Sequence, residues 1–175
     1  MTRASQSSLT VVGCDPGLAN LGLGAVRETG KQASWLGAVV LRTNTRQPLA
    51  ARLEQLHDGV TGFLVEHRPD AIAIEAQYFH QQRDTAFKVG QAVGVTLLAA
   101  AKLGIEVFEY GPMQVKQALV GSGRADKTQV LYMVRALLGP EAATLNHHAG
   151  DALALALTHL NSRRVNAAAW PVAAR

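Results

Sequence analysis

Short apolar runs alternate along the chain with longer segments whose apolar residues recur at helical spacing. Residues 9–14 form the first run, which leads into an Asp-Pro-Gly turn and predicts a buried strand. Residues 20–27 and 34–42 predict two more strands, which would form an antiparallel meander with the first. Leucine, valine and phenylalanine then repeat at helical spacing over residues 49–63, and this pattern predicts a long helix.

The second half of the chain predicts two further strands and several helices. Residues 71–74 are fully apolar and lead into Glu75, and residues 105–109 predict the fifth strand. Helices are predicted at residues 84–102, from Pro112 onward, at 126–138 and at 148–160. This order of elements predicts an α/β fold, in which a five-stranded mixed sheet carries helices on both faces.

The length of 175 residues fits one domain with a full hydrophobic core. We expect this domain to span residues 9–162. Residues 1–8 are polar and predict a flexible amino-terminal extension, and residues 163–175 predict a disordered tail.

The composition is that of a globular protein with a mildly basic balance. Hydrophobic residues make up 48% of the chain, and 17 Lys and Arg against 13 Asp and Glu give a net charge of +4, which is compatible with a polyanionic partner such as nucleic acid. Cys14 is the only cysteine, which excludes a disulfide framework and a cysteine-rich zinc site within one chain. The amino terminus lacks the apolar core of a secretory signal, and the apolar stretch 93–101 is too short to span a bilayer. We therefore expect a cytoplasmic protein.

Three carboxylates and one histidine stand at informative places. Asp15 and Glu75 follow the first and fourth predicted strands, and in open α/β sheets sites form outside the carboxyl ends of strands. His148 and Asp151 are three residues apart, which puts both on one face of the last helix. Oxygen ligands favour Mg²⁺ or Mn²⁺, and a histidine suits Mn²⁺ well. Two such ions can activate water and stabilise the leaving oxygen of a phosphodiester.

Each of these residues also has an ordinary structural interpretation. An aspartate before Pro-Gly is usually a turn residue, and Glu75 is equally compatible with a solvent-facing strand end. Asp151 lies in the first turn of a helix, where a carboxylate favours the macrodipole. His148 follows His147, and such a pair is more often a polar cap than a ligand. Only the joint placement of the four favours a metal site.

Seven stretches carry a resemblance to a known family. They are residues 12–17 (VGCDPG), 73–75 (AIE), 88–92 (KVGQA), 108–110 (FEY), 114–117 (QVKQ), 120–123 (VGSG) with Lys127, and 148–154 (HAGDALA). In this order they resemble the RuvC family of crossover-junction endodeoxyribonucleases over nearly the whole chain. The resemblance implies an RNase H-like fold, a homodimer and Mg²⁺-dependent, paired symmetric nicking of Holliday junctions in DNA recombination and repair. It also implies RuvA and RuvB, the branch-migration proteins, as partners.

The resemblance assigns the acidic site to Asp15, Glu75, His148 and Asp151. Family members carry Asp or His at the position of His148, so two roles stay open for this residue: metal ligand, or a group that polarises the attacking water. Mg²⁺ is the expected metal, with Mn²⁺ as the alternative and two ions per site.

Basic and aromatic residues complete the expected DNA-binding set. Lys116 and Lys127 resemble family residues near the scissile phosphate, and a lysine there can neutralise charge that develops on the phosphoryl group, so Lys116 joins the catalytic set. Arg124 lies between them in a glycine-rich loop and is expected to bind backbone phosphate. Tyr78 and Phe79 follow Glu75. We expect Tyr78, with Phe79 as the alternative, to stack on an unpaired base at the junction.

The approximate two-fold symmetry of a four-way junction favours a two-fold dimer, because one active site cannot reach both strands without letting go. The Gly- and Ala-bearing helix 84–102 is the candidate contact face; packing of this face within the chain is the alternative. Three competing functions are an RNase H-like nuclease that trims structured RNA, an actin-like phosphotransferase, and a module that binds junctions without cutting. The phosphotransferase would need a second lobe, for which 175 residues are too few.

Overall fold

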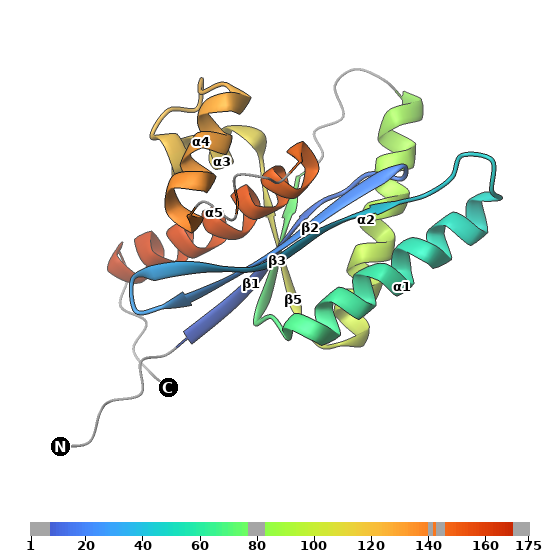
Figure 1. The fold of residues 1–175 in the computed structure, drawn as a ribbon, viewed down its shortest axis with the longest axis horizontal. Coiled ribbons are helices and arrows are strands. Elements are labelled where there is room, and N and C mark those ends of the chain that lie inside the picture. Colours follow the sequence, from blue (N-terminus) through green and yellow to red (C-terminus); the bar gives the residue numbers. More distant parts are fainter. Residues whose placement is uncertain (1–7, 77–82, 140–141, 143–145, 170–175) are drawn as a thin grey trace.

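A computed structural model describes residues 8–76, 83–139, 142 and 146–169, and it has the strand and helix order that the sequence predicts (Figure 1). The strands are β1 (Ser8–Asp15), β2 (Asn20–Thr29), β3 (Gln32–Arg42), β4 (Ala71–Glu75) and β5 (Glu106–Tyr110). The helices are α1 (Leu49–His67), α2 (Arg83–Lys102), α3 (Pro112–Val120), α4 (Lys127–Leu138) and α5 (His147–Ala169). None of the described helices is long and apolar enough to cross a membrane.

The strands form one mixed sheet in the order β3-β2-β1-β4-β5. β1 pairs antiparallel with β2 and β2 with β3, whereas β1 and β4, and β4 and β5, pair in parallel. The predicted five-stranded mixed sheet is therefore confirmed, and β1 and β4 lie next to each other within it.

Helices cover both faces of the sheet, with α1 and α2 on one side and α3, α4 and α5 on the other (Figure 1). Side chains of β1 alternate between the two faces, as in any strand. Val12 and Cys14 enter the core under α1 and α2, where burial raises the pKa of the Cys14 thiol to about 12. Val11 joins the second core with Leu153 and Leu157 of α5. Cys14 is thus an inert core residue.

Two glycines allow α5 to lie directly on the sheet. A Cβ built at Gly13 of β1 would overlap the carbonyl oxygen of Ala152 in α5. A Cβ built at Gly22 of β2 would overlap the carbonyl oxygen of His148. Because no side chain stands between the backbones, the first turns of α5 are held next to the carboxyl end of β1.

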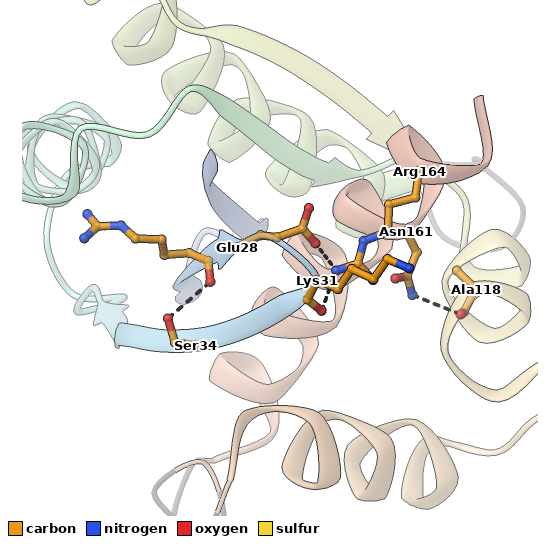
Figure 2. A network of polar contacts seen from close by, with 7 residues as sticks. Glu28, Lys31, Ser34, Ala118, Asn161 and Arg164 are labelled. Atoms are coloured by element: carbon orange, nitrogen blue, oxygen red, sulfur yellow. Dashed lines mark hydrogen bonds and ion pairs between the residues drawn. The ribbon is translucent and has the colours of Figure 1, made fainter. Parts of the chain in front are cut away.

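Helix α5 extends further than the predicted helix, which ends at residue 160. Residues 163–169 continue the helix; they were expected to belong to a disordered segment. Figure 2 shows how this part is held: Arg164 forms an ion pair with Glu28 and donates a hydrogen bond to the Lys31 carbonyl at 2.9 Å. Asn161 donates to the Ala118 carbonyl at 3.3 Å. These contacts to the β2–β3 turn and to α3 extend the helix past the predicted end.

Candidate active site

Asp15 and Glu75 end two neighbouring strands of the sheet. The parallel register pairs Cys14 of β1 with Ile74 of β4. The next residues, Asp15 and Glu75, therefore leave the sheet side by side at the same edge. Their placement follows from an apolar run in each strand that ends in a carboxylate.

His148 and Asp151 lie in the first turns of α5, next to this edge. The side chain of Asn146 accepts a hydrogen bond from the Ala149 N–H at 3.0 Å, which fixes where the helix begins. The spacing of three residues directs His148 and Asp151 to one face, as predicted.

A cavity of about 400 Å³ gathers the polar residues of both elements. Its charged and imidazole groups belong to Asp15, Glu75, Lys116, Lys127, His148 and Asp151. All four residues predicted as metal ligands therefore share one pocket with two of the predicted basic residues. These residues are spread over 137 positions of sequence, from 15 to 151, and meet only through the fold.

The Asp15 carboxylate is more buried than the side chains of His148, Lys127 and Asp151. Its side chain is 18% exposed and its Oδ2 lies 2.8 Å from Nδ1 of His148. Burial raises the pKa of Asp15, and the negative charge of Asp151 raises it further, although the hydrogen bond with His148 opposes the shift. The ionised carboxylate is thus under electrostatic strain that a cation would relieve.

Lys127 is the cation closest to Asp151, with Nζ 2.6 Å from Oδ2. It begins α4, and the preceding Asp126 caps that helix by accepting a hydrogen bond from the Gln129 N–H at 2.9 Å. The bond with Asp151 raises the pKa of Lys127, and the charges of Asp15 and Glu75 raise it further. The field of all three carboxylates therefore reaches the Lys127 ammonium, and a cation is favoured at this place.

The donor set fits a hard divalent cation. Three carboxylates and one imidazole face one pocket, and carboxylate oxygens are the ligands that Mg²⁺ and Mn²⁺ prefer. Among the described residues, no three His, Cys, Asp or Glu side chains stand in a ready-made metal-binding group. Asp15 is instead bonded to His148, and Asp151 to Lys127. These contacts would have to open or share their oxygens for an ion to bind.

Sequence reasoning missed the apolar part of the pocket. Val115 of α3, Val130 of α4, and Ala154 and Leu155 of α5 line it together with the charged groups. The helical spacing from Asp151 to Ala154 and Leu155 was a usable signal, because residues three and four apart share a face. The apolar lining lowers the local dielectric, so the charges of the pocket act on one another more strongly.

Arg124, a predicted DNA-binding residue, is not among the described residues that line this pocket. Arg124 is exposed in the loop between α3 and α4. This loop is closed by Gln117, which donates to the Gly121 carbonyl at 3.0 Å and accepts from the Gly123 N–H at 3.1 Å. Tyr78 and Phe79 lie outside the described residues.

Comparison of the sequence with protein families gives one match of long extent. A family model described as "Crossover junction endodeoxyribonuclease RuvC" matches residues 11–159. A RuvC from Thermus thermophilus is 44% identical over 163 residues, which cover 91% of this chain and 98% of that protein. A RuvC from Rubrobacter xylanophilus is 44% identical over 94% of this chain and 92% of that protein.

Solved structures resemble the chain in the same way. A structure titled "T. thermophilus RuvC in complex with Holliday junction substrate" matches with a TM-score of 0.86 and 44% identity, covering 90% of this chain and 96% of that one. The yeast mitochondrial Holliday junction resolvase Ydc2 matches with a TM-score of 0.63 at 11% identity, covering 88% of this chain and 78% of that one, which shows a shared fold alone. The RNase H-like fold expected from the sequence is thereby confirmed.

Proposed function

The chain belongs to the crossover junction endodeoxyribonuclease RuvC family, and from this premise we propose that it resolves Holliday junctions by paired, symmetric, metal-dependent nicks in DNA. The relative with a TM-score of 0.86 is titled as a complex with Holliday junction substrate. The observation that carries the proposal to this chain is the pocket, in which Asp15, Glu75, His148 and Asp151 meet.

The carboxylates of Asp15, Glu75 and Asp151, with the imidazole of His148, would hold the metal. We propose Mg²⁺, with Mn²⁺ as the alternative and two ions per site. A bound pair of such ions supplies an activated water and neutralises charge on the leaving oxygen of a phosphodiester. His148 already bonds to Asp15 and so orients that carboxylate. This bond is compatible with both proposed roles of the imidazole, metal ligand and polarisation of the attacking water.

The lysines of the pocket would act on the phosphate itself. Lys116 lines the cavity from α3 and would neutralise charge that develops on the phosphoryl group. Lys127 would move from Asp151 to a phosphate oxygen once the carboxylates are neutralised by metal, because its side chain is 62% exposed and already at the pocket. Both residues add positive charge around an acidic centre, which the DNA backbone requires.

Residues beyond the pocket would bind the rest of the junction. Arg124, exposed in a loop that Gln117 holds closed, would contact backbone phosphate. Tyr78, or its neighbour Phe79, would stack on an unpaired base at the centre of the junction. RuvA and RuvB are the proposed branch-migration partners, by membership of the family.

A homodimer through α2 would place two active sites on one junction. A Cβ built at Gly90 or Gly94 meets no atom within 4 Å, so these glycines are not needed for packing within the chain. Phe87 and Leu98 lie on the same side of α2 as these glycines, and the two residues are 70% and 53% exposed. An apolar stripe with a flat glycine centre suits close, self-complementary helix packing.

The proposal is tested with an immobile synthetic four-way junction, labelled on each strand in turn. The protein is incubated with Mg²⁺ or with EDTA, and linear duplex and RNA–DNA hybrid of the same sequence serve as competing substrates. We expect paired nicks at symmetry-related positions of the junction, with Mg²⁺ only. Equal cutting of linear duplex, or preferred cutting of the hybrid, would contradict junction resolution.

A matched pair of variants connects the activity to the pocket. Asp15→Asn removes one carboxylate from the site, and we expect it to bind the junction and leave it uncut. Asp58→Asn makes the same change on α1, where the Asp58 side chain is 75% exposed, and should cut like the wild type. Normal cutting by Asp15→Asn would show that the site is assigned wrongly.

A further inference from the structure

A partly buried hydrogen bond connects the end of strand β5 to helix α5. The hydroxyl of Tyr110, the last residue of β5, lies 2.8 Å from Nδ1 of His159. His159 is only 2% exposed, although histidine is a polar residue. None of the roles proposed above uses either side chain.

Aromatic packing fixes both partners of this bond. The ring of Phe108 lies 4.5 Å from the His159 ring between centroids, and the Tyr110 ring meets it edge-on at 5.9 Å. Burial raises the pKa of Tyr110, although a hydrogen bond with the Ser162 side chain of α5 opposes the shift, and burial lowers the pKa of His159. Both groups are therefore neutral near pH 7, and the bond persists across the physiological range.

Tyr110 stands next to one half of the pocket. In the parallel register it pairs with Glu75, and its carbonyl accepts a hydrogen bond from the Ala76 N–H at 2.9 Å. It also immediately precedes Gly111, the N-cap of α3, and this helix carries Lys116. Through its backbone, Tyr110 thus adjoins the residues that position both Glu75 and Lys116.

His159 belongs to the other half of the pocket. It lies on α5, eight residues after Asp151, or about 12 Å along the helix at 1.5 Å per residue. The same rigid helix carries His148 and Asp151. The Tyr110–His159 bond therefore joins the Glu75 and Lys116 side of the pocket to the His148 and Asp151 side.

Such a connection has an electrostatic reason. Glu75 shares the pocket with Asp15 and Asp151, and like charges at close range repel one another. In the described part of the chain, β5 is an edge strand with β4 as its one neighbour, so the sheet supports this side of the pocket from one direction. Carboxylate repulsion favours separation of this side from α5, and two hydrogen bonds oppose it: Tyr110–His159 from β5 and Asn161–Ala118 from α3.

Resting on the proposed nuclease function, we infer that Tyr110 is a positioning residue for the reaction. Its bond to His159 sets the distance between two sides of the pocket: Glu75 and Lys116 on one side, and His148 and Asp151 of α5 on the other. Tyr110 does not touch the reacting atoms. Its effect is on metal affinity and on the rate of the bound complex.

The test removes one hydroxyl with Tyr110→Phe and keeps the ring. Two readouts are measured: Mn²⁺ binding without DNA, from the loss of the free-ion signal in electron paramagnetic resonance, and junction cleavage with saturating Mg²⁺. We expect each to weaken roughly tenfold, the usual size of an effect on the groups that support metal ligands. Junction affinity in EDTA should stay at the wild-type value, because no phosphate contact changes.

Variants of the partner distinguish positioning from a general loss of stability. His159→Leu should weaken both readouts in the same direction as Tyr110→Phe, and the double variant should weaken them no further than Tyr110→Phe alone. His159→Asn places an amide near the position of Nδ1 and should restore most of the function. Thr158→Val removes a buried hydroxyl from the same helix, where it donates to the Ala154 carbonyl at 2.7 Å, and should lower the melting temperature without changing metal affinity.

Tyr132→Phe, the same change at a tyrosine that is 68% exposed, is the remaining control. If Tyr110→Phe binds Mn²⁺ and cuts like Tyr132→Phe, the positioning role is wrong. If Thr158→Val loses metal affinity equally, the effect is only one of stability, and the inference is again wrong. Failure of the wild type to cut junctions would overturn the proposed function instead, while Mn²⁺ binding would still report on Tyr110.

Discussion

Gly22→Ala tests whether the close contact between α5 and the sheet sets up the pocket. The added methyl group would stand between β2 and the first turn of α5, because a Cβ at Gly22 overlaps the His148 carbonyl oxygen and lies 3.2 Å from the His148 Cβ. No charged or polar group is changed. Gly22 pairs in register with Asp15, so the disturbance occurs directly beside the candidate metal ligands.

The size of the effect follows from the overlap. Carbon and carbonyl oxygen approach to about 3.3 Å at ordinary contact, so the start of α5 must move away by roughly 1 Å. Overpacking of this kind costs about 1–3 kcal/mol of the free energy of unfolding. A displacement of about 1 Å in an active site lowers a rate on the order of 10²-fold. We therefore expect a folded protein whose cleavage rate is lower by about that factor.

Two measurements decide this prediction. Urea unfolding gives the change in stability, and single-turnover junction cleavage with saturating Mg²⁺ gives the rate. Gly24→Ala is the matched control, because the same change in the same strand meets mainly the Leu153 side chain, which is not part of the pocket lining. A wild-type rate in Gly22→Ala, or an equal loss of rate in Gly24→Ala, would refute the reasoning.

Four further predictions concern charge and assembly. The pKa of Asp15 in the folded protein is raised above its ordinary value of 3.8, so the native state binds the proton more tightly than the unfolded state does. The free energy of unfolding therefore falls as pH rises from 3.8 through the folded pKa. In EDTA, Asp15→Asn should unfold at higher urea than the wild type, and the difference should be larger at pH 7 than at pH 4. Lys116→Ala should lower the cleavage rate about 10²-fold but change metal-free junction affinity by less than about fivefold, as gel-shift titration would show. Arg124→Ala should reduce the slope of log affinity against log salt by about one, and an unchanged slope would remove Arg124 from the phosphate contacts. Leu98→Asp should shift the protein from dimer to monomer in analytical ultracentrifugation, whereas Leu103→Asp, beyond the stripe, should not.

The sheet and the convergence of the acidic residues were predictable because both follow from local patterns. An apolar strand that ends in a carboxylate occurs at Asp15 and at Glu75, and right-handed crossovers bring such strand ends to one edge. The i, i+3 spacing of His148 and Asp151 needs only the helix. Local sequence patterns therefore suffice to predict that Asp15, Glu75, His148 and Asp151 lie close together.

The remaining features depend on contacts between segments far apart in the chain. The pairing of Lys127 with Asp151 requires the packing of α4 on α5, and the Tyr110–His159 bond requires that of β5 on α5. The helical residues 163–169 depend on Arg164 reaching the β2–β3 turn. Hydrophobic periodicity carries no information about such long-range contacts, so the sequence predicted neither these bonds nor the continuation of the last helix to residue 169.

Anomalous X-ray diffraction from crystals soaked in Mn²⁺ tests the central claim most directly, because manganese scatters anomalously and light atoms do not. We predict anomalous density between the carboxylates of Asp15, Glu75 and Asp151, and none there in crystals of Asp15→Asn. Fully occupied Mn²⁺ elsewhere on the protein, with no density in this pocket, would contradict the account.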